Sequence, residues 1–169
     1  MAGPHTLAET ERTVEQRLAE LTLDRSAMSV ISNLFRAANA VRNYMEQHVL
    51  APVELTWTAF VVLWVIWIWG EAETRVIAEE CGVSKATLSG VLATLEGRGL
   101  LTRTKSEADR RLVLVSLTPS GTRLIKRLFP LINEAETHAV RLIAGREHAQ
   151  IADQFRLLVE AVDESNLPS

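Results

Sequence analysis

One helix signal followed by two strand signals limits the fold of this chain more than any other feature. Ser84 is a candidate N-cap, and the apolar residues after it recur at the i, i+3, i+4 and i+7 spacing of a helix with one buried face: Leu88, Val91, Leu92 and Leu95. Two strand-like runs, residues 100–103 and 112–117, then flank a polar loop. The segment therefore predicts a helix that leads directly into a β-hairpin.

The residues before Ser84 predict a second helix packed against the first. A small residue at Ala78 lets two helices cross closely, Gly82 allows a tight turn, and Leu88 and Val91 seal the pair. This spacing is typical of a helix-turn-helix. The positions that point away from the seam are small, polar or basic, as a surface pressed against bases and phosphates requires: Lys85, Ala86, Thr87, Ser89 and Gly90.

The tip of the predicted hairpin carries two adjacent arginines, Arg110 and Arg111. Asp109 can pair with one of them and hold its side chain in one pose. An arginine held at such a tip can enter a narrow DNA minor groove, where the negative potential is enhanced. A charged, solvated turn is the alternative interpretation, and the helix-turn-helix just before the hairpin favours DNA binding.

Charge is concentrated in one part of the chain, although the net charge is only −3. Residues 97–127 hold two acidic side chains, Glu107 and Asp109, and eight basic ones: Arg98, Arg103, Lys105, Arg110, Arg111, Arg123, Lys126 and Arg127. The rest of the chain is therefore acidic. Such a body can bind DNA by its basic end, with Arg103, Arg110 and Arg111 as candidate contacts, while its other faces are repelled.

Several motifs together resemble the multiple-antibiotic-resistance regulator (MarR) family of transcription factors. They are Leu55-Thr56 with Phe60 and Leu63, Ile77-Ala78-Glu79, Val83 to Ser89, Leu95 to Arg103, Asp109-Arg110-Arg111, and Leu117 to Gly121. The resemblance covers about residues 26–163. It implies a homodimeric winged helix-turn-helix repressor, with Ser84, Lys85, Thr87 and Ser89 facing the major groove. It also implies that Arg111 enters the minor groove, positioned by Asp109.

The expected fold is mainly α, with a small β-hairpin and dimerisation helices at both ends. Residues 1–50 and 119–169 supply the dimerisation helices, and residues 51–118 form the winged helix-turn-helix. A first amphipathic helix is expected through Leu7, Val14, Leu18 and Leu21. Further helices are expected over 26–48 (stopped by Pro52), 57–69 (capped by Thr56), 74–81 (capped by Thr74), 118–143 and 147–163. By the resemblance, the terminal helices pair two copies on a pseudo-palindromic DNA operator, with half-sites about 34–36 Å apart. A monomer that packs its own apolar stripes is the alternative.

An uncharged apolar run extends from Leu55 to Gly70. It is 16 residues long, short of the roughly 20 needed to cross a bilayer, and glutamates flank it. We therefore expect a buried helix and no membrane partner. No secretory signal is visible, and one cysteine cannot form an internal disulfide, so a cytoplasmic location is expected.

Four tryptophans crowd this apolar helix. Members of the family commonly release DNA when a small, often aromatic, anion binds between the dimerisation helices and the winged domain. Trp57, Trp64 and Trp67 are candidate residues for such a pocket, with Arg36 or His48 as charge partners. Core packing is the alternative role for the indoles. The urate-responsive branch of the family is disfavoured, because Leu18 and Ala59 stand where it has tryptophan and aspartate.

Other chemistry has weaker support. Cys81 lies inside the helix-turn-helix, where an inert buried cysteine is expected rather than an oxidant sensor. Glu134 and His138 have i, i+4 spacing, but a solvated helix face explains them, and no metal or cofactor is expected. Phosphate-loop, zinc and nucleophile motifs of enzymes are missing. The alternative function is a winged helix that binds proteins, or chromosomes non-specifically, without responding to a ligand.

Overall fold

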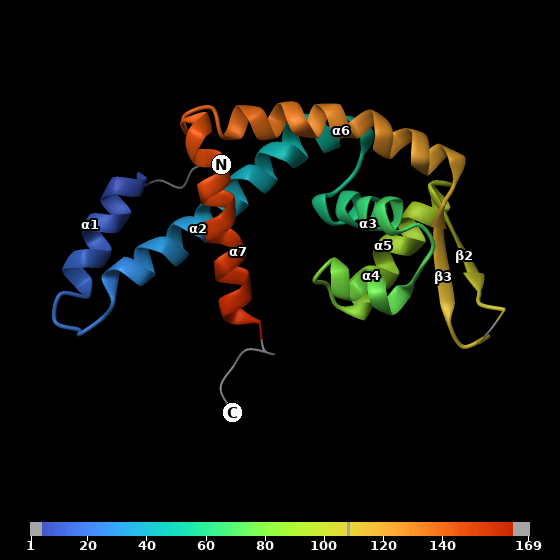
Figure 1. The fold of residues 1–169 in the computed structure, drawn as a ribbon, viewed down its shortest axis with the longest axis horizontal. Coiled ribbons are helices and arrows are strands. Elements are labelled where there is room, and N and C mark those ends of the chain that lie inside the picture. Colours follow the sequence, from blue (N-terminus) through green and yellow to red (C-terminus); the bar gives the residue numbers. More distant parts are fainter. Residues whose placement is uncertain (1–4, 108, 164–169) are drawn as a thin grey trace. The chain divides into compact units, whose positions relative to one another are not determined.

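The computed structural model describes residues 5–107 and 109–163, and it confirms a mainly helical chain with one small sheet (Figure 1). Contacts divide the chain into two units, residues 1–39 and 40–169. We describe each unit by itself.

The first unit contains α1 (Leu7–Arg17) and most of α2 (Arg25–Met45). Thr6 begins α1 with a capping box, in which it exchanges hydrogen bonds with Glu9. At the start of α2, the amide of Ala27 donates to the Asp24 carboxylate at 2.9 Å.

The second unit begins at Ala40, inside α2, and the winding of the helix changes a few residues later. Helix α2 continues into a π-helix, η1 (Glu46–Leu50), and a 3₁₀ turn, η2 (Ala51–Val53), rather than ending near His48 as expected. Glu54 then adopts a left-handed conformation with φ 53°, the only positive φ of a non-glycine residue in the described ranges. The junction is therefore a tightly wound corner, not a simple proline stop.

Helix α3 (Trp57–Trp69) begins and ends where the sequence predicts. The Thr56 hydroxyl accepts from the Ala59 amide at 3.2 Å and caps the helix, as expected. One side of α3 is fully buried, with Val62 and Leu63 at 0% exposure. In the described ranges no single helix is long and apolar enough to cross a membrane; residues 25–53 and 57–69 pass that test only as a pair bent by 77°.

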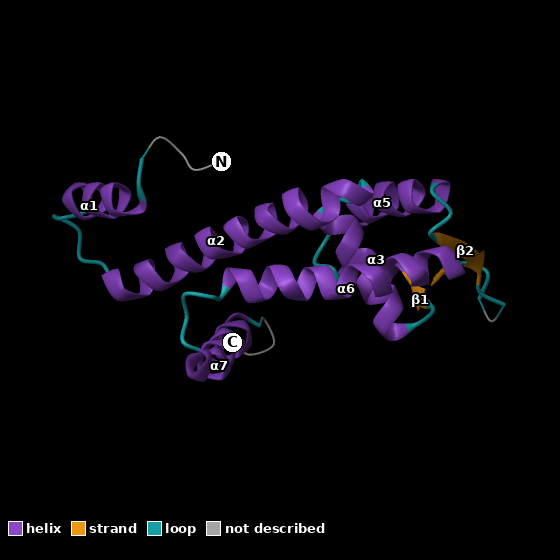
Figure 2. Cartoon of the chain, turned by 90° about the horizontal axis from the view of Figure 1, so that it is seen from above, coloured by secondary structure: helices purple, strands orange, loops and turns teal. Residues whose placement is uncertain are grey.

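Three short strands form an antiparallel sheet in the order β1-β3-β2, at the end of the molecule where α6 begins (Figure 2). They are β1 (Ala72–Glu73), β2 (Leu101–Lys105) and β3 (Val113–Leu117). The hairpin was predicted, but β1 was not. Thr74 does not cap α4 (Thr74–Glu80), so that prediction is wrong: Glu73, held extended in the sheet, is the N-cap residue.

The helix-turn-helix consists of α4 and α5 (Lys85–Gly97), joined by a turn in which Gly82 has the expected positive φ of 61°. Helix α6 (Pro119–Ala139) follows β3 and ends four residues earlier than predicted. A 3₁₀ turn, η3 (Gly145–Glu147), then precedes α7 (His148–Val162).

Helix α6 is anchored to the segment that joins α5 to β2. The Thr118 hydroxyl donates to the carbonyl of Gly99 at 2.7 Å, and its amide donates to the carbonyl of Leu100 at 3.1 Å. A Cβ atom at Gly121 would lie 2.0 Å from that same Leu100 oxygen. Only glycine therefore allows this approach, which gives the Leu-Thr-x-x-Gly motif a structural reason.

Candidate nucleic-acid interface

Helix α5 presents one face to the core and the other to solvent. Leu88, Leu92 and Leu95 are at most 2% exposed, which fixes the rotation of the helix in the domain. All the predicted groove-facing residues are exposed: Ser84, Lys85, Ala86, Thr87, Ser89 and Gly90. The sequence pattern therefore placed this face correctly, although its contacts with DNA stay a prediction.

The N-terminus of α5 is capped by the side chain of Ser84. The Ser84 hydroxyl accepts from the Thr87 amide at 3.1 Å and lies 2.9 Å from the Thr87 hydroxyl. No atom lies within 4 Å of a Cβ built at Gly90, so the centre of the exposed face is open. A flat, polar helix start of this kind can approach base edges closely.

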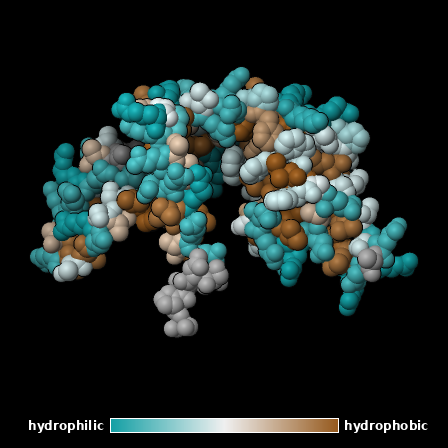
Figure 3. Space-filling model, viewed as in Figure 1, coloured by the Kyte–Doolittle hydropathy of each residue, from teal (hydrophilic) through white to brown (hydrophobic). Residues whose placement is uncertain are grey.

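The hairpin tip holds one arginine in a fixed orientation. The Asp109 carboxylate accepts from the Arg111 amide at 3.0 Å and from Arg111 Nε and Nη2 at 3.0–3.3 Å. The same contacts lower the pKa of Asp109 below its usual range, so the carboxylate stays charged. Arg111 remains 90% exposed. The pairing orients the guanidinium without removing it from solvent, and hydrophilic side chains project from this tip (Figure 3).

The base of the tip is ordered by a buried serine, Ser106. Its hydroxyl accepts from the Asp109 amide at 3.4 Å, and its own amide donates to the Leu112 carbonyl at 3.0 Å. Arg110, the other predicted DNA contact in the tip, lines a hollow beside Lys105, Ser106 and Glu107. The two neighbouring arginines thus have different surroundings.

Arg103, also predicted to contact DNA, is engaged within the protein. Its guanidinium forms an ion pair with Glu96 at the end of α5, and this contact lowers the pKa of the Glu96 carboxyl. The ion pair joins strand β2 to helix α5. A contact between Arg103 and a phosphate therefore requires either that the phosphate binds next to Glu96 or that the Arg103–Glu96 ion pair breaks.

Arg75 was missed by sequence reasoning. It helps to line a groove of about 300 Å³ together with Thr74, Lys85, Leu88, Ser89, Leu92, Arg103 and Val113. Its Nε lies 3.6 Å from Glu79, an i, i+4 pair that looks in sequence like any solvated helix face. Only the packing of α4 against α5 and the sheet brings this arginine beside Lys85.

The candidate ligand residues have different surroundings. Trp57 lies against Phe60 and Trp67 against Phe129, with ring centroids 5.7 and 5.0 Å apart, whereas Trp64 is 41% exposed. Core packing thus accounts for two of the three indoles.

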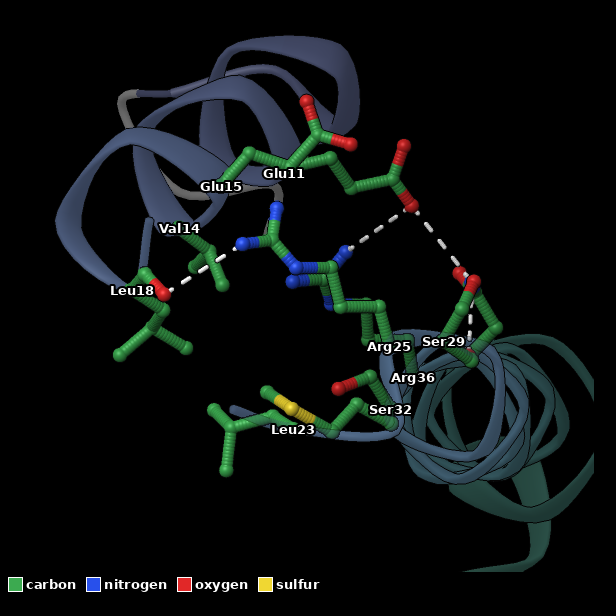
Figure 4. Close-up of a pocket in the computed structure, with 11 residues that line it drawn as sticks. Glu11, Val14, Glu15, Leu18, Leu23, Arg25, Ser29, Ser32 and Arg36 are labelled. Atoms are coloured by element: carbon green, nitrogen blue, oxygen red, sulfur yellow. Dashed lines mark hydrogen bonds and ion pairs between the residues drawn. The ribbon is translucent and has the colours of Figure 1, made fainter. Parts of the chain in front are cut away.

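Arg36 belongs to the first unit. It faces Glu11 at 3.9 Å and lines a cavity of about 190 Å³ between α1 and α2, which Arg25 also lines (Figure 4).

His48 takes part in a three-ring stack. Tyr44 lies between His48 and His138, with centroids 4.3 and 5.1 Å away. No group of three potential metal ligands occurs within residues 5–107 and 109–163. His138, considered in sequence as a metal ligand with Glu134, is thus an aromatic packing partner.

Cys81 is partly buried at the end of α4. Burial, followed by the charge of Glu80, raises the pKa of its thiol to about 11. The thiolate, which is the reactive form, is therefore scarce at neutral pH.

A helix-turn-helix with an open, polar recognition face, followed by a hairpin with an oriented arginine at its tip, defines a winged-helix DNA-binding protein. The MarR family model matches residues 55–113. A Bacillus subtilis relative, the uncharacterized helix-turn-helix-type transcriptional regulator YwaE, is 44% identical over 73% of this chain and 71% of its own length. This chain belongs to the MarR family of DNA-binding transcriptional regulators.

Two further similarities agree with that assignment. The organic hydroperoxide resistance transcriptional regulator of B. subtilis is 32% identical over 69% of this chain and 78% of its own. The structure of BpsR from Bordetella bronchiseptica, described as regulated in DNA binding by 6-hydroxynicotinic acid, superposes with a TM-score of 0.72 at 27% identity. That match covers 78% of this chain and 98% of BpsR. These relatives are named for regulation, not for enzymatic activity.

Proposed function

We propose that this chain is a homodimeric repressor that binds a pseudo-palindromic operator and leaves it when a small aromatic acid binds. The exposed start of α5 enters the major groove, and Arg111 enters the adjacent minor groove. The single observation that carries this assignment is the Asp109–Arg111 pair, which orients a nearly fully exposed guanidinium at the hairpin tip. A charged turn without a function does not require such a fixed pose.

The dimer is proposed from exposed apolar side chains. Helix α7 exposes Phe155, Leu157, Val159 and Val162 at 46–72%, and its surface shows apolar patches (Figure 3). In the first unit, Val30 and Phe35 of α2 are 54% and 65% exposed. Large apolar side chains exposed in a row mark protein interfaces. Residues 1–50 and 119–169 thus form the dimer in this proposal, and residues 51–118 bind DNA.

The proposed trigger is an aromatic acid rather than an oxidant. Trp57, Trp64 and Trp67 offer indole faces, and His48, in the same unit, offers a partner for a carboxylate; BpsR, regulated by 6-hydroxynicotinic acid, is a relative with that chemistry. The hydroperoxide regulator is also a relative. However, the raised pKa of Cys81 disfavours the thiolate that an oxidant would attack.

A gel-shift assay on the DNA upstream of this chain's own gene tests the proposal. We expect a shifted complex whose stability falls steeply with salt concentration, because protein contacts to phosphates release counterions. We also expect one compound of an aromatic-acid panel to dissociate this complex. Equal binding to unrelated DNA would instead indicate a non-specific chromosome-binding module. Absence of DNA binding would indicate a protein-interaction module, and sedimentation of the free protein as a monomer would reject the dimer.

A further inference from the structure

Helix α5, the proposed recognition helix, contacts a part of the chain distant in sequence through its C-cap residue, Arg98. Arg98 Nη1 donates to the carbonyl of Glu54 at 2.7 Å, and Nη2 donates to the carbonyl of Val53 at 2.8 Å. The guanidinium thus bridges two successive backbone oxygens that lie 44 and 45 residues earlier in the sequence. A planar fork of two donors suits this geometry, whereas a lysine ammonium does not.

The bridged carbonyls belong to the corner between α2 and α3. Here the chain passes from a π-helix through a 3₁₀ turn to the left-handed Glu54. Such backbone conformations persist only where the surroundings hold them. Arg98 supplies one such contact from α5.

The same corner is fixed to α3 from the other side. The Glu46 carboxylate, in η1, accepts from the Trp57 amide at 2.8 Å. Leu50 and Leu55, on either side of the corner, are 0% and 5% exposed. The corner therefore contacts the start of α3 through Glu46 and the end of α5 through Arg98.

We propose that Arg98 is a positioning residue for DNA binding, which fixes the recognition helix to the α2–α3 corner and does not itself contact DNA. A displacement of the corner, including one caused by a ligand near Trp57, is then passed to α5. This inference rests on the proposed role of α5 as the recognition helix.

Three variants test the proposal: Arg98→Ala, Arg98→Lys and, as a matched exposed control, Arg146→Ala, which pairs only with neighbouring Glu147 in the described contacts. Affinity for the upstream DNA is measured by fluorescence anisotropy over a salt series, at a temperature where circular dichroism shows every variant folded. We expect both Arg98 variants to bind roughly three- to thirty-fold more weakly with an unchanged salt slope. The control should bind like the wild type.

A direct phosphate contact predicts the opposite pattern. Arg98→Lys would then keep most of the affinity, and Arg98→Ala would lower the salt slope by about one. That result, or unchanged affinity in both Arg98 variants, would overturn the proposal.

Hydrogen–deuterium exchange provides a readout that does not require DNA. Both Arg98 variants should exchange faster than the wild type over residues 46–57 and 94–100, and the control should not. If the wild type binds no upstream DNA, the proposed function fails, while this exchange comparison still decides whether Arg98 fixes the corner. Unchanged exchange at the corner would reject the clamp.

Discussion

The Asp109 side chain binds both the backbone and the side chain of Arg111. The carboxylate accepts from the Arg111 amide and from two nitrogens of its guanidinium, all within 3.0–3.3 Å. Arginine normally loses considerable rotamer freedom when it binds a ligand. Because the hairpin tip imposes that order in the free protein, the minor-groove contact that we propose would cost Arg111 less rotamer entropy.

Replacing Arg111 tests its contact with DNA. We expect Arg111→Ala to weaken binding to the upstream DNA roughly five- to 100-fold, since a charged contact in an electronegative groove is lost. Fluorescence anisotropy measures the change, with Arg146→Ala as the control. Equal affinity of Arg111→Ala and the wild type would reject the minor-groove role.

Replacing Asp109 separates orientation from charge. Asp109→Asn keeps Arg111 but removes the charged acceptor that orients it, so we expect a smaller loss of affinity than for Arg111→Ala. The double variant should lose no more than Arg111→Ala alone, because Asp109 acts through that arginine. Additive losses in this double-mutant cycle would show that Asp109 acts independently.

The Asp109–Arg111 pair at the hairpin tip should persist in mild acid. Hydrogen bonds from Arg111 lower the pKa of Asp109 below its ordinary value of 3.8. For a carboxyl with a lowered folded-state pKa, the stabilisation is present above the ordinary pKa and is lost as the pH falls through the folded value. We therefore expect the midpoint of the Asp109 carboxyl signal in an NMR titration to lie below pH 3.8. A midpoint above 3.8 would contradict the pairing.

Cys81 should react slowly. Its thiol pKa is raised from 9.0 to about 11, so the thiolate at neutral pH is about 100-fold rarer than in an ordinary thiol. We expect alkylation by iodoacetamide to be correspondingly slower in the folded chain than in urea. Cys81→Ala should keep wild-type DNA binding with or without an organic hydroperoxide. Release of the wild type alone by hydroperoxide would identify an oxidant sensor.

The contact between Gly121 and Leu100 predicts a stability difference between two glycines. Gly121→Ala places a methyl against a carbonyl oxygen, and we expect the free energy of unfolding to fall by roughly 1–3 kcal/mol. Gly97→Ala fills open space at the end of α5, and stability should stay unchanged or rise by about 0.5–1 kcal/mol. Urea unfolding measures both. Equal effects would show that α6 tolerates a shift away from Leu100.

Local signals predicted the elements that depend on neighbouring residues. The cap at Thr56, the turn at Gly82 and the cap at Ser84 each involve contacts within a few positions, and the structure confirms all three. Strand β1 was missed because its two residues, Ala72 and Glu73, form a strand only by pairing with Val115 and Leu114. The wrong cap at Thr74 has the same origin.

The sequence by itself determined the helix-turn-helix, the hairpin and the exposed face of α5, because apolar periodicity and capping are encoded within single elements. Tertiary structure alone decided which partner each arginine near the proposed DNA-binding face has. Arg103, Arg98 and Arg111 look alike in sequence, yet packing gives them Glu96, two backbone carbonyls and Asp109 as partners. A side chain of this length can reach many groups, and only the folded chain determines which of them lies within hydrogen-bond distance.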